Sequence, residues 1–222
     1  MKKLFLASAV TALAAGGAFA DEVRIGVILG FTGPLESITP HMADGAELAI
    51  REISESGLFL GGTTVAPVRA DSGCIDSALA TASAERLINS DRIIGIMGAD
   101  CSGVTRAVLE NVAMANGVPM ISPSATSPGF STFDSGGIFY RTAPSDARQG
   151  EVLAGIVMER GFDTVAVTHT NNDYGAGLAN AFAENFTAMG GTITITVPHE
   201  EAKGDYSAEV GSLASAGGDA LV

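Results

Sequence analysis

Apolar and polar positions along this chain form two kinds of segment that follow one another in turn. Short runs of β-branched and other apolar residues are typical of strands buried on both faces of a parallel sheet. Longer segments, with apolar residues three or four positions apart, are typical of helices that cover such a sheet. The first strand run spans residues 23–29, and the first helical pattern spans residues 42–53. The predicted apolar stripe of that helix consists of Ala46, Ala49, Ile50 and Ile53.

The same alternation continues along the rest of the chain. Further strands are predicted at residues 64–70, 93–98, 119–122, 138–141, 164–168 and 192–197, with another beginning at residue 219. Further helices are predicted from the capping residue Asp76 to Asn89 and at residues 103–116, 151–160, 174–189 and 207–216. This order favours the α/β class, with parallel sheets that carry helices on both faces.

The alternation restarts after Arg141, which indicates two lobes. We expect an N-terminal lobe over residues 21–142 and a second lobe over residues 143–222, with the crossing near residues 142–144. The sequence stops within an apolar strand pattern, and a strand start without its crossover partner is a poor natural ending. We therefore expect a C-terminally truncated fragment in which the second lobe is incomplete.

The first twenty residues have the three parts of a cleavable secretory signal peptide. Lys2 and Lys3 give a positive start, residues 4–15 form an apolar run, and residues 18–20 (Ala-Phe-Ala) precede the cleavage site. The apolar run is shorter than the roughly 20 residues that a membrane-spanning helix needs. We expect cleavage after Ala20 and a protein that works outside the cytoplasm; the alternative is an N-terminal membrane anchor.

The charge and the apolar runs of the mature chain limit the kinds of partner that it is expected to bind. Removal of the signal peptide takes two lysines from the 12 basic residues and leaves 10 basic and 25 acidic residues, a formal charge of −15. No basic stripe is present for a phosphate backbone, so nucleic acid is not an expected partner. No later apolar run approaches transmembrane length, and we expect the remaining 202 residues to be soluble, with a large core in one or two domains.

The mature chain has two cysteines, Cys74 and Cys101, each just past a predicted strand end. In an oxidising compartment an even count suggests one disulfide, which would stabilise the fold by about 3.5 kcal/mol in the chain-entropy estimate. Two free thiols are the alternative. Neither cysteine has a His or a further Cys at ligand spacing, so we expect no metal site.

Catalytic signatures are absent from the sequence. It contains neither a Gly-x-Ser-x-Gly nucleophile elbow nor a Gly-x-x-x-x-Gly-Lys-Ser/Thr phosphate loop. The stretch at residues 175–180 begins like a dinucleotide fingerprint but lacks the third glycine, and it indicates a helix N-terminus. Neighbouring carboxylates, such as Glu200 with Glu201 and Asp71 with Asp76, lie in or beside loops and are interpreted as solvated charge. We predict neither an enzyme nor a cofactor.

Small hydroxyl residues follow two predicted strands of the first lobe. Ligands of open parallel sheets bind at the carboxyl ends of the strands. Ser102 opens a helix there, and its hydroxyl and the nearby N–H groups can hold a carboxylate; alternatively, Ser102 only caps the helix. The next loop, residues 122–128, offers the Thr126 hydroxyl and backbone carbonyls that can accept from an ammonium group, unless it is an ordinary stiff surface loop. Together these groups suit a zwitterion.

At these residues the chain resembles a known family, the periplasmic substrate-binding proteins of ABC importers, in the branch that binds leucine, isoleucine, valine and related amino acids. The resemblance runs through almost the whole mature chain. Its motifs are Ile25-Gly26-Val27, Thr32-Gly33-Pro34, Gly45-Ala46-Glu47-Leu48-Ala49, Cys101-Ser102 to Thr105, Pro119-Met120-Ile121-Ser122-Pro123-Ser124-Ala125-Thr126, Tyr140-Arg141-Thr142 and Asp173-Tyr174-Gly175.

The resemblance implies the two-lobed type 1 periplasmic binding protein fold, each lobe a parallel sheet with helices on both faces. It implies that Ser102 and Thr126 hold the α-carboxylate of the ligand, that the Ser124 carbonyl takes the ammonium group, and that Tyr174 closes over the ligand from the second lobe. It also implies a Cys74–Cys101 disulfide next to the pocket. The predicted ligand-binding residues are Asp100, Ser102, Ser124, Ala125, Thr126 and Tyr174.

Two departures from the family pattern concern the ligand. The first loop has Glu36-Ser37-Ile38-Thr39 where amino-acid binders often place an aromatic residue. Asp100 stands where leucine binders commonly have an apolar residue. Either Asp100 favours a polar or cationic ligand group, or its carboxylate bonds to loop amides. The family's acidic partner for the ligand's ammonium group belongs to a later part of the sequence that this chain does not include.

The resemblance predicts a periplasmic, monomeric solute-binding protein that passes an amino acid to the membrane permease of an ABC importer. A ligand-sensing module of the same fold and, less favoured, an exported hydrolase are the alternatives. A transport role predicts reversible binding without turnover, whereas a hydrolase would release a product.

Overall fold

The structure is a computed structural model that describes residues 22–222; the predicted signal peptide lies outside them. Its strands are β1 (Glu22–Leu29), β2 (Thr64–Asp71), β3 (Gly95–Gly98), β4 (Met120–Ser122), β5 (Phe139–Arg141), β6 (Thr164–Thr170), β7 (Thr192–His199) and β8 (Ala220–Leu221). Its helices are α1 (Thr39–Ser56), α2 (Ser77–Asn89), α3 (Ser102–Val108), α4 (Met114–Asn116), α5 (Asp146–Glu159), α6 (Asp173–Ala188) and α7 (Ser207–Ala216), with shorter segments η1 (Phe59–Gly61), η2 (Leu109–Ala113) and η3 (Pro128–Ser131). The predicted alternation of strands and helices is confirmed.

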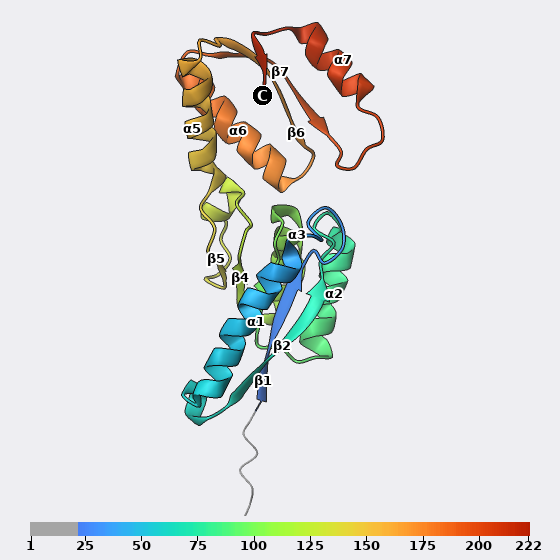
Figure 1. Cartoon of the computed structure of the whole chain (residues 1–222), viewed down its shortest axis with the longest axis vertical. Helices are drawn as coiled ribbons and strands as arrows, with labels where there is room; N and C mark the ends of the chain where they lie inside the picture. Colours follow the sequence, from blue (N-terminus) through green and yellow to red (C-terminus); the bar gives the residue numbers. More distant parts are fainter. Residues whose placement is uncertain (1–21) are drawn as a thin grey trace, which may run out of the picture.

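Figure 1 shows two lobes, each built on its own sheet. The first sheet has the strand order β2-β1-β3-β4-β5 and the second has β7-β6-β8, and all neighbouring strands are parallel. The predicted parallel α/β architecture is therefore confirmed. The carboxyl ends of parallel strands meet at one edge, and the first sheet turns this edge toward the second lobe (Figure 1).

Helices cover both faces of the first sheet because successive residues of β1 point to opposite faces. Val27 and Leu29 pack against α1. Ile28, between them, packs in a larger core with residues of α2 and of the continuous helix formed by α3, η2 and α4. That helix ends at Gly117 in the predicted left-handed conformation, with φ 63°.

Of the four residues in the predicted apolar stripe of α1, only Ile50 is buried in the structure. Ile50 is 9% exposed, whereas Ile53 is 49% exposed, and the unpredicted Ala43 is fully buried. The helix begins at Thr39, three residues before the expected start, and packs on the sheet through residues nearer its N-terminus. The predicted cap of α2 is confirmed, because the Asp76 carboxylate accepts from the backbone N–H of Leu79 at 2.9 Å.

The core of the second lobe lies between its sheet and the helices α5 and α6. Val165 and Val167 of β6 pack with Phe182 and Phe186 of α6, whose rings stack with centroids 5.2 Å apart. Figure 1 shows α7 on the opposite side of this sheet. No helix among residues 22–222 is long and apolar enough to cross a membrane.

The backbones of α5 and α6 approach closely at Gly150. A Cβ atom on Gly150 would lie 2.6 Å from the backbone nitrogen of Phe182 and 2.7 Å from the Cβ of Ala181. Gly155, in the same helix, would place its Cβ with no atom within 4 Å. Only glycine fits at position 150, and the two helices pack there as one unit.

Within residues 22–222 the chain passes between the two sheets once, from Arg141 at the end of β5 to Asp146 at the start of α5. The Asp146 N–H donates to the Thr126 carbonyl at 2.9 Å. The Arg141 guanidinium donates to two carbonyls of the loop at residues 123–127; burial lowers its pKa, although the nearby Asp146 carboxylate opposes this effect. The predicted lobe boundary at residue 142 falls in this connection and stays a prediction.

The two glycines of α5 provide a test of the helix contact. Replacing Gly150→Ala should destabilise the protein by about 1–3 kcal/mol because its Cβ overpacks the α6 backbone. Gly155→Ala should instead stabilise it by about 0.4–1 kcal/mol, since alanine restricts the unfolded chain and favours helix. Urea unfolding of both variants measures the difference. Equal effects of the two substitutions would contradict the close packing.

Candidate functional site

One cavity of about 980 Å³ lies between the strand-end loops of the two lobes. First-lobe loops after β1, β2, β3 and β4 form one wall, and the loops after β6 and β7 form the other. Five of the six predicted ligand-binding residues line it: Asp100, Ser102, Ser124, Thr126 and Tyr174. The five residues thus lie together at the carboxyl ends of parallel strands, where ligands of such sheets bind, and their contact with a ligand stays a prediction.

Ala125 is the exception among the predicted residues. Its side chain is fully buried and does not line the cavity. Its N–H donates to the Ser122 hydroxyl at 2.9 Å, and its carbonyl accepts from Arg141 at 3.0 Å. Both backbone groups therefore help to hold the shape of the loop, and a contact between Ala125 and a ligand stays a prediction.

Hydroxyl groups connect the loops after β3 and β4. The Ser102 hydroxyl, at the start of α3, accepts from the Ser127 N–H at 3.2 Å. The Ser124 hydroxyl donates to the Asp100 carbonyl at 2.9 Å, and the Ser122 hydroxyl donates to the Ala99 carbonyl at 2.5 Å. These bonds hold the two loops at fixed positions relative to each other.

The same loops leave polar groups free to face the cavity. Within residues 22–222, no group donates to the Ser124 carbonyl oxygen, and the Thr126 hydroxyl has no hydrogen-bond partner. The first N–H groups of the helix that Ser102 opens have no acceptor within the helix. An acceptor and several donors are thus available side by side on the first-lobe wall.

Asp100 has both carboxylate oxygens occupied by the first lobe. Its side chain is 1% exposed. One oxygen accepts from the Gly30 N–H at 3.0 Å and the other from the Ser72 hydroxyl at 3.0 Å. Asp100 therefore ties the loops after β1 and β2 to the end of β3. This geometry supports the loop-bonding alternative, and a contact between Asp100 and a ligand stays a prediction.

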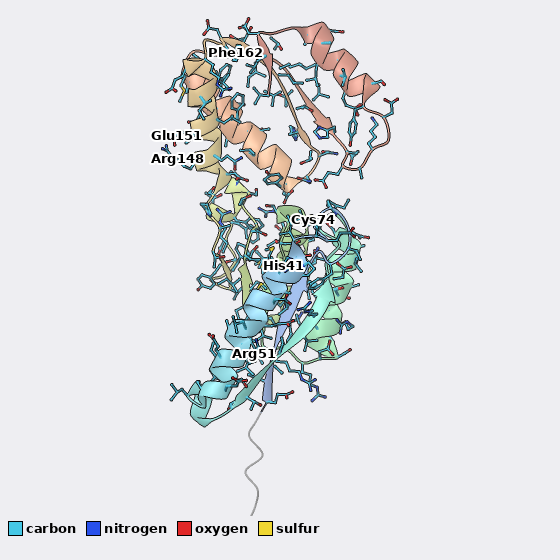
Figure 2. The ribbon with its side chains drawn as sticks, viewed as in Figure 1. His41, Arg51, Cys74, Arg148, Glu151 and Phe162 are labelled. Carbon is cyan, nitrogen blue, oxygen red and sulfur yellow. A yellow bond between two sulfur atoms is a disulfide. The ribbon has the colours of Figure 1, made fainter. Side chains whose placement is uncertain are left out.

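Cys74 and Cys101 form a disulfide next to the cavity, across 27 positions of sequence. Figure 2 shows the Cys74 side chain at the end of the first lobe that faces the second. The predicted disulfide is confirmed over two free thiols. The sulfur atoms and a carboxylate oxygen of Asp100 lie within 4.8 Å of one another. Because both cysteines are bonded, they offer no thiolate to a metal ion.

A second carboxylate, Asp71, fixes the loop after β1. It accepts from the N–H and the hydroxyl of Thr32, at 3.2 and 2.6 Å, and from the Gly73 N–H at 2.9 Å. Burial raises the pKa of Asp71, but these hydrogen bonds outweigh it and hold the pKa below its ordinary value. Asp71 is thus a bonded structural residue, contrary to its interpretation as solvated charge.

Second-lobe carboxylates also line the cavity, and the sequence analysis missed them. Glu200 accepts from the Asn171 amide at 2.7 Å, and Glu201 accepts from the Asn172 amide at 2.8 Å. Asn172 also caps α6 through the Gly175 N–H at 2.9 Å. The strand-end rule applied to β7, which ends at His199, would have found both glutamates; they had been interpreted as solvated charge.

Charge in the cavity is mainly negative. Among the described residues, the only basic side chain that lines it is Arg106. The carboxylates that line it are Asp100, Glu110, Asp173, Glu200 and Glu201. A ligand with an ammonium group is favoured electrostatically over a ligand that carries only a carboxylate.

The chain is similar to known binding proteins over its described length. A profile of the family described as periplasmic binding protein matches residues 22–222. The Leu/Ile/Val-binding protein homolog 3 of Brucella melitensis is 34% identical, over 97% of this chain and 57% of the relative. The leucine-, isoleucine-, valine-, threonine- and alanine-binding protein of Pseudomonas aeruginosa is 29% identical, over 98% of this chain and 57% of the relative.

Comparison with solved structures also identifies binding proteins of the same fold. The crystal structure of a leucine-binding protein, LivK, from Thermotoga maritima superposes with a TM-score of 0.75 at 28% identity. The superposition covers 90% of this chain and 55% of that structure. This chain therefore spans somewhat more than half the length of these proteins.

Removal of the disulfide tests its contribution to the loops around the cavity. The double variant Cys74→Ser with Cys101→Ser should lose about 3.5 kcal/mol of unfolding free energy, because the unfolded chain regains the freedom of a 27-residue loop. Urea titrations with and without a reducing agent measure this loss. Reduction should lower the stability of the parent and leave the double variant unchanged; a parent whose stability does not respond to reduction would contradict the assignment.

Asp100→Leu tests the loop-tying role of the buried carboxylate. The variant should lose about 3 kcal/mol, because it leaves the Gly30 N–H and the Ser72 hydroxyl buried without partners. Glu36→Leu, at an exposed position, should change stability by less than about 0.5 kcal/mol. Urea unfolding and ligand preference are measured together. Unchanged stability with an altered ligand preference would instead assign Asp100 to the ligand.

Proposed function

Because this chain belongs to the periplasmic binding protein family, we propose that it captures an amino acid, branched-chain or related, between its two lobes. It then delivers the amino acid to the membrane permease of an ABC importer. The observation that carries the proposal is a cavity bounded by strand ends of both lobes, where Ser102, Ser124, Thr126 and Tyr174 come together. Relatives whose names specify leucine, isoleucine and valine support this ligand class.

The free polar groups of the first lobe fit the two charges of an amino acid. The hydroxyls of Ser102 and Thr126, with the first N–H groups of α3, are donors suited to the α-carboxylate. The carbonyl of Ser124 is an acceptor suited to the ammonium group. Because the loop bonds already fix these groups, they bind without a further cost of ordering.

Apolar side chains on the first-lobe wall support an apolar ligand side chain. Leu35, Ile75 and Val104 line the cavity beside the polar groups. Ile75 is 50% exposed in this structure, so a bound aliphatic side chain would remove apolar surface from water on both molecules. Tyr174 is 43% exposed and stands on the opposite wall, where it would cover the ligand.

Membership of the family also supports a cellular compartment and a mode of action for this protein. Its members are periplasmic binding proteins, and we infer that this protein acts in the periplasm as a monomer and releases its ligand unchanged. The acidic cavity supports a zwitterion over a carboxylate without an amino group. A ligand-dependent sensor of the same fold would bind the same molecules, and the identity of its membrane partner would distinguish it.

The test is thermal melting of the purified protein against a panel of amino acids and small carboxylates. A ligand that binds only the folded state should raise Tm by several degrees when its concentration is well above Kd. We expect the rise with leucine, isoleucine or valine, and none with benzoate. The absence of a shift across all amino acids would reject amino-acid binding.

Single substitutions then assign the contacts. Ser102→Ala and Thr126→Ala should each weaken binding by about tenfold or more, because each removes a donor to a charged carboxylate. Thr132→Ala, at an exposed position after η3, should leave Kd unchanged. Isothermal titration measures all three. Equal affinities of Thr126→Ala and Thr132→Ala would remove Thr126 from the site.

A further inference from the structure

Arg106 stands on the first-lobe wall of the cavity, in the second turn of α3. Its guanidinium lies over the rings of Phe130 and Phe133, with its central carbon 5.1 and 4.8 Å from their centroids. Its side chain is 27% exposed. The two rings restrict the rotamers of this long side chain before it meets any carboxylate.

The same guanidinium pairs with one carboxylate from each lobe. Its Nη1 atom donates to the carboxylate of Glu110, which lies four residues later in the same continuous helix, at 2.7 Å. Nε donates to Asp173, at the start of α6 in the second lobe, at 3.0 Å. Among the ion pairs of residues 22–222, Arg106–Asp173 is the only one that joins the two lobes.

A close backbone contact lies beside this ion pair. A Cβ atom on Gly177 of α6 would lie 2.8 Å from Cδ of Pro128 and 3.0 Å from the Ser127 hydroxyl oxygen. The N-terminal part of α6 therefore rests directly on the first lobe. Tyr174 lies between the two contacts in sequence, with Asp173 on one side and Gly177 on the other, and it lines the cavity.

We propose that Arg106 is a positioning residue for ligand capture: by holding Asp173, it fixes the first turn of α6 so that Tyr174 stands over the cavity. This inference rests on the proposed function, because it assigns Tyr174 to the ligand. Exposed ion pairs contribute little, since ordering two long side chains opposes them. Here Arg106 is already held by two rings and by Glu110, so the pair with Asp173 costs less side-chain entropy.

The ion pair between Arg148 and Glu151, both in α5, provides a control outside the cavity. Arg106→Gln and Asp173→Asn each break the contact between the lobes, whereas Glu151→Gln breaks an ion pair within the second lobe. Asp173→Asn combined with Arg106→Gln closes a double-mutant cycle. Arg106→Lys keeps the positive charge but removes the planar guanidinium that lies over the two rings.

The first measurement needs no ligand. Spin labels on cysteines introduced at the exposed positions Arg51 and Arg160, one in each lobe, report the distance between the lobes by pulsed electron paramagnetic resonance. Arg51 lies on α1, away from the cavity (Figure 2). Arg106→Gln and Asp173→Asn should broaden the distance distribution, the double variant should broaden it no further, and Glu151→Gln should keep it narrow.

The second measurement is the affinity for L-leucine by isothermal titration. Arg106→Gln and Asp173→Asn should each weaken binding about fivefold, and together no more than either alone. Glu151→Gln should stay within about twofold of the parent, and Arg106→Lys should recover only part of the affinity, because an ammonium group lacks the planar fork that pairs with two carboxylates and lies over the rings.

The two measurements separate this inference from the proposed function. Additive effects of Arg106→Gln and Asp173→Asn, or an effect of Glu151→Gln as large as theirs, would overturn the positioning role. If the distance distributions follow the expected pattern while the parent binds no amino acid, the contact between the lobes stands and the proposed function fails.

Discussion

The buried carboxylate of Asp100 is the group on which the first-lobe wall depends. It is 1% exposed and accepts from Gly30 and Ser72, so three strand-end loops converge on one charge. A buried charge that loses its partners costs several kcal/mol, and the loops are therefore held where they can supply donors. The disulfide at Cys101 constrains the same region covalently. Ser102 follows directly in sequence, and both constraints fix its position.

The two walls of the cavity are held in different ways. The first-lobe wall is joined by hydrogen bonds between loops, by a disulfide and by the core beneath it, so its donors and acceptors are set before a ligand arrives. The second wall consists of Tyr174 and of asparagine–glutamate pairs at strand ends. Within residues 22–222, the two lobes that carry these walls are joined by one connection with its Asp146–Thr126 hydrogen bond, by the Arg106–Asp173 ion pair and by the contact at Gly177. Such an arrangement suits a ligand that first binds to a fixed surface and is then covered.

Much of this architecture could be predicted from the sequence, because buried parallel strands leave contiguous apolar runs and their ends mark the site. Ser102 and Thr126 were found in this way. Glu200 and Glu201 follow the end of β7 and obey the same rule, but two adjacent carboxylates also fit a solvated loop, and they were interpreted in that way. Arg106 was missed for a different reason: its partner in the second lobe lies 67 positions away, and no local pattern links such residues.

The contact at Gly150 has a mechanical consequence. It joins α5 to α6 backbone against backbone, and α5 begins only a few residues after the first sheet ends at Arg141. The two helices therefore form one rigid unit, with the short connection before α5 as its hinge and the turn at Asp173 at its far end. A change of a few degrees in the backbone torsions of this hinge would displace whole side chains near Asp173, and the packing inside the lobe would be preserved. Within residues 22–222, relative rotation of the two lobes would thus be concentrated in the four residues 142–145, none of which lines the cavity.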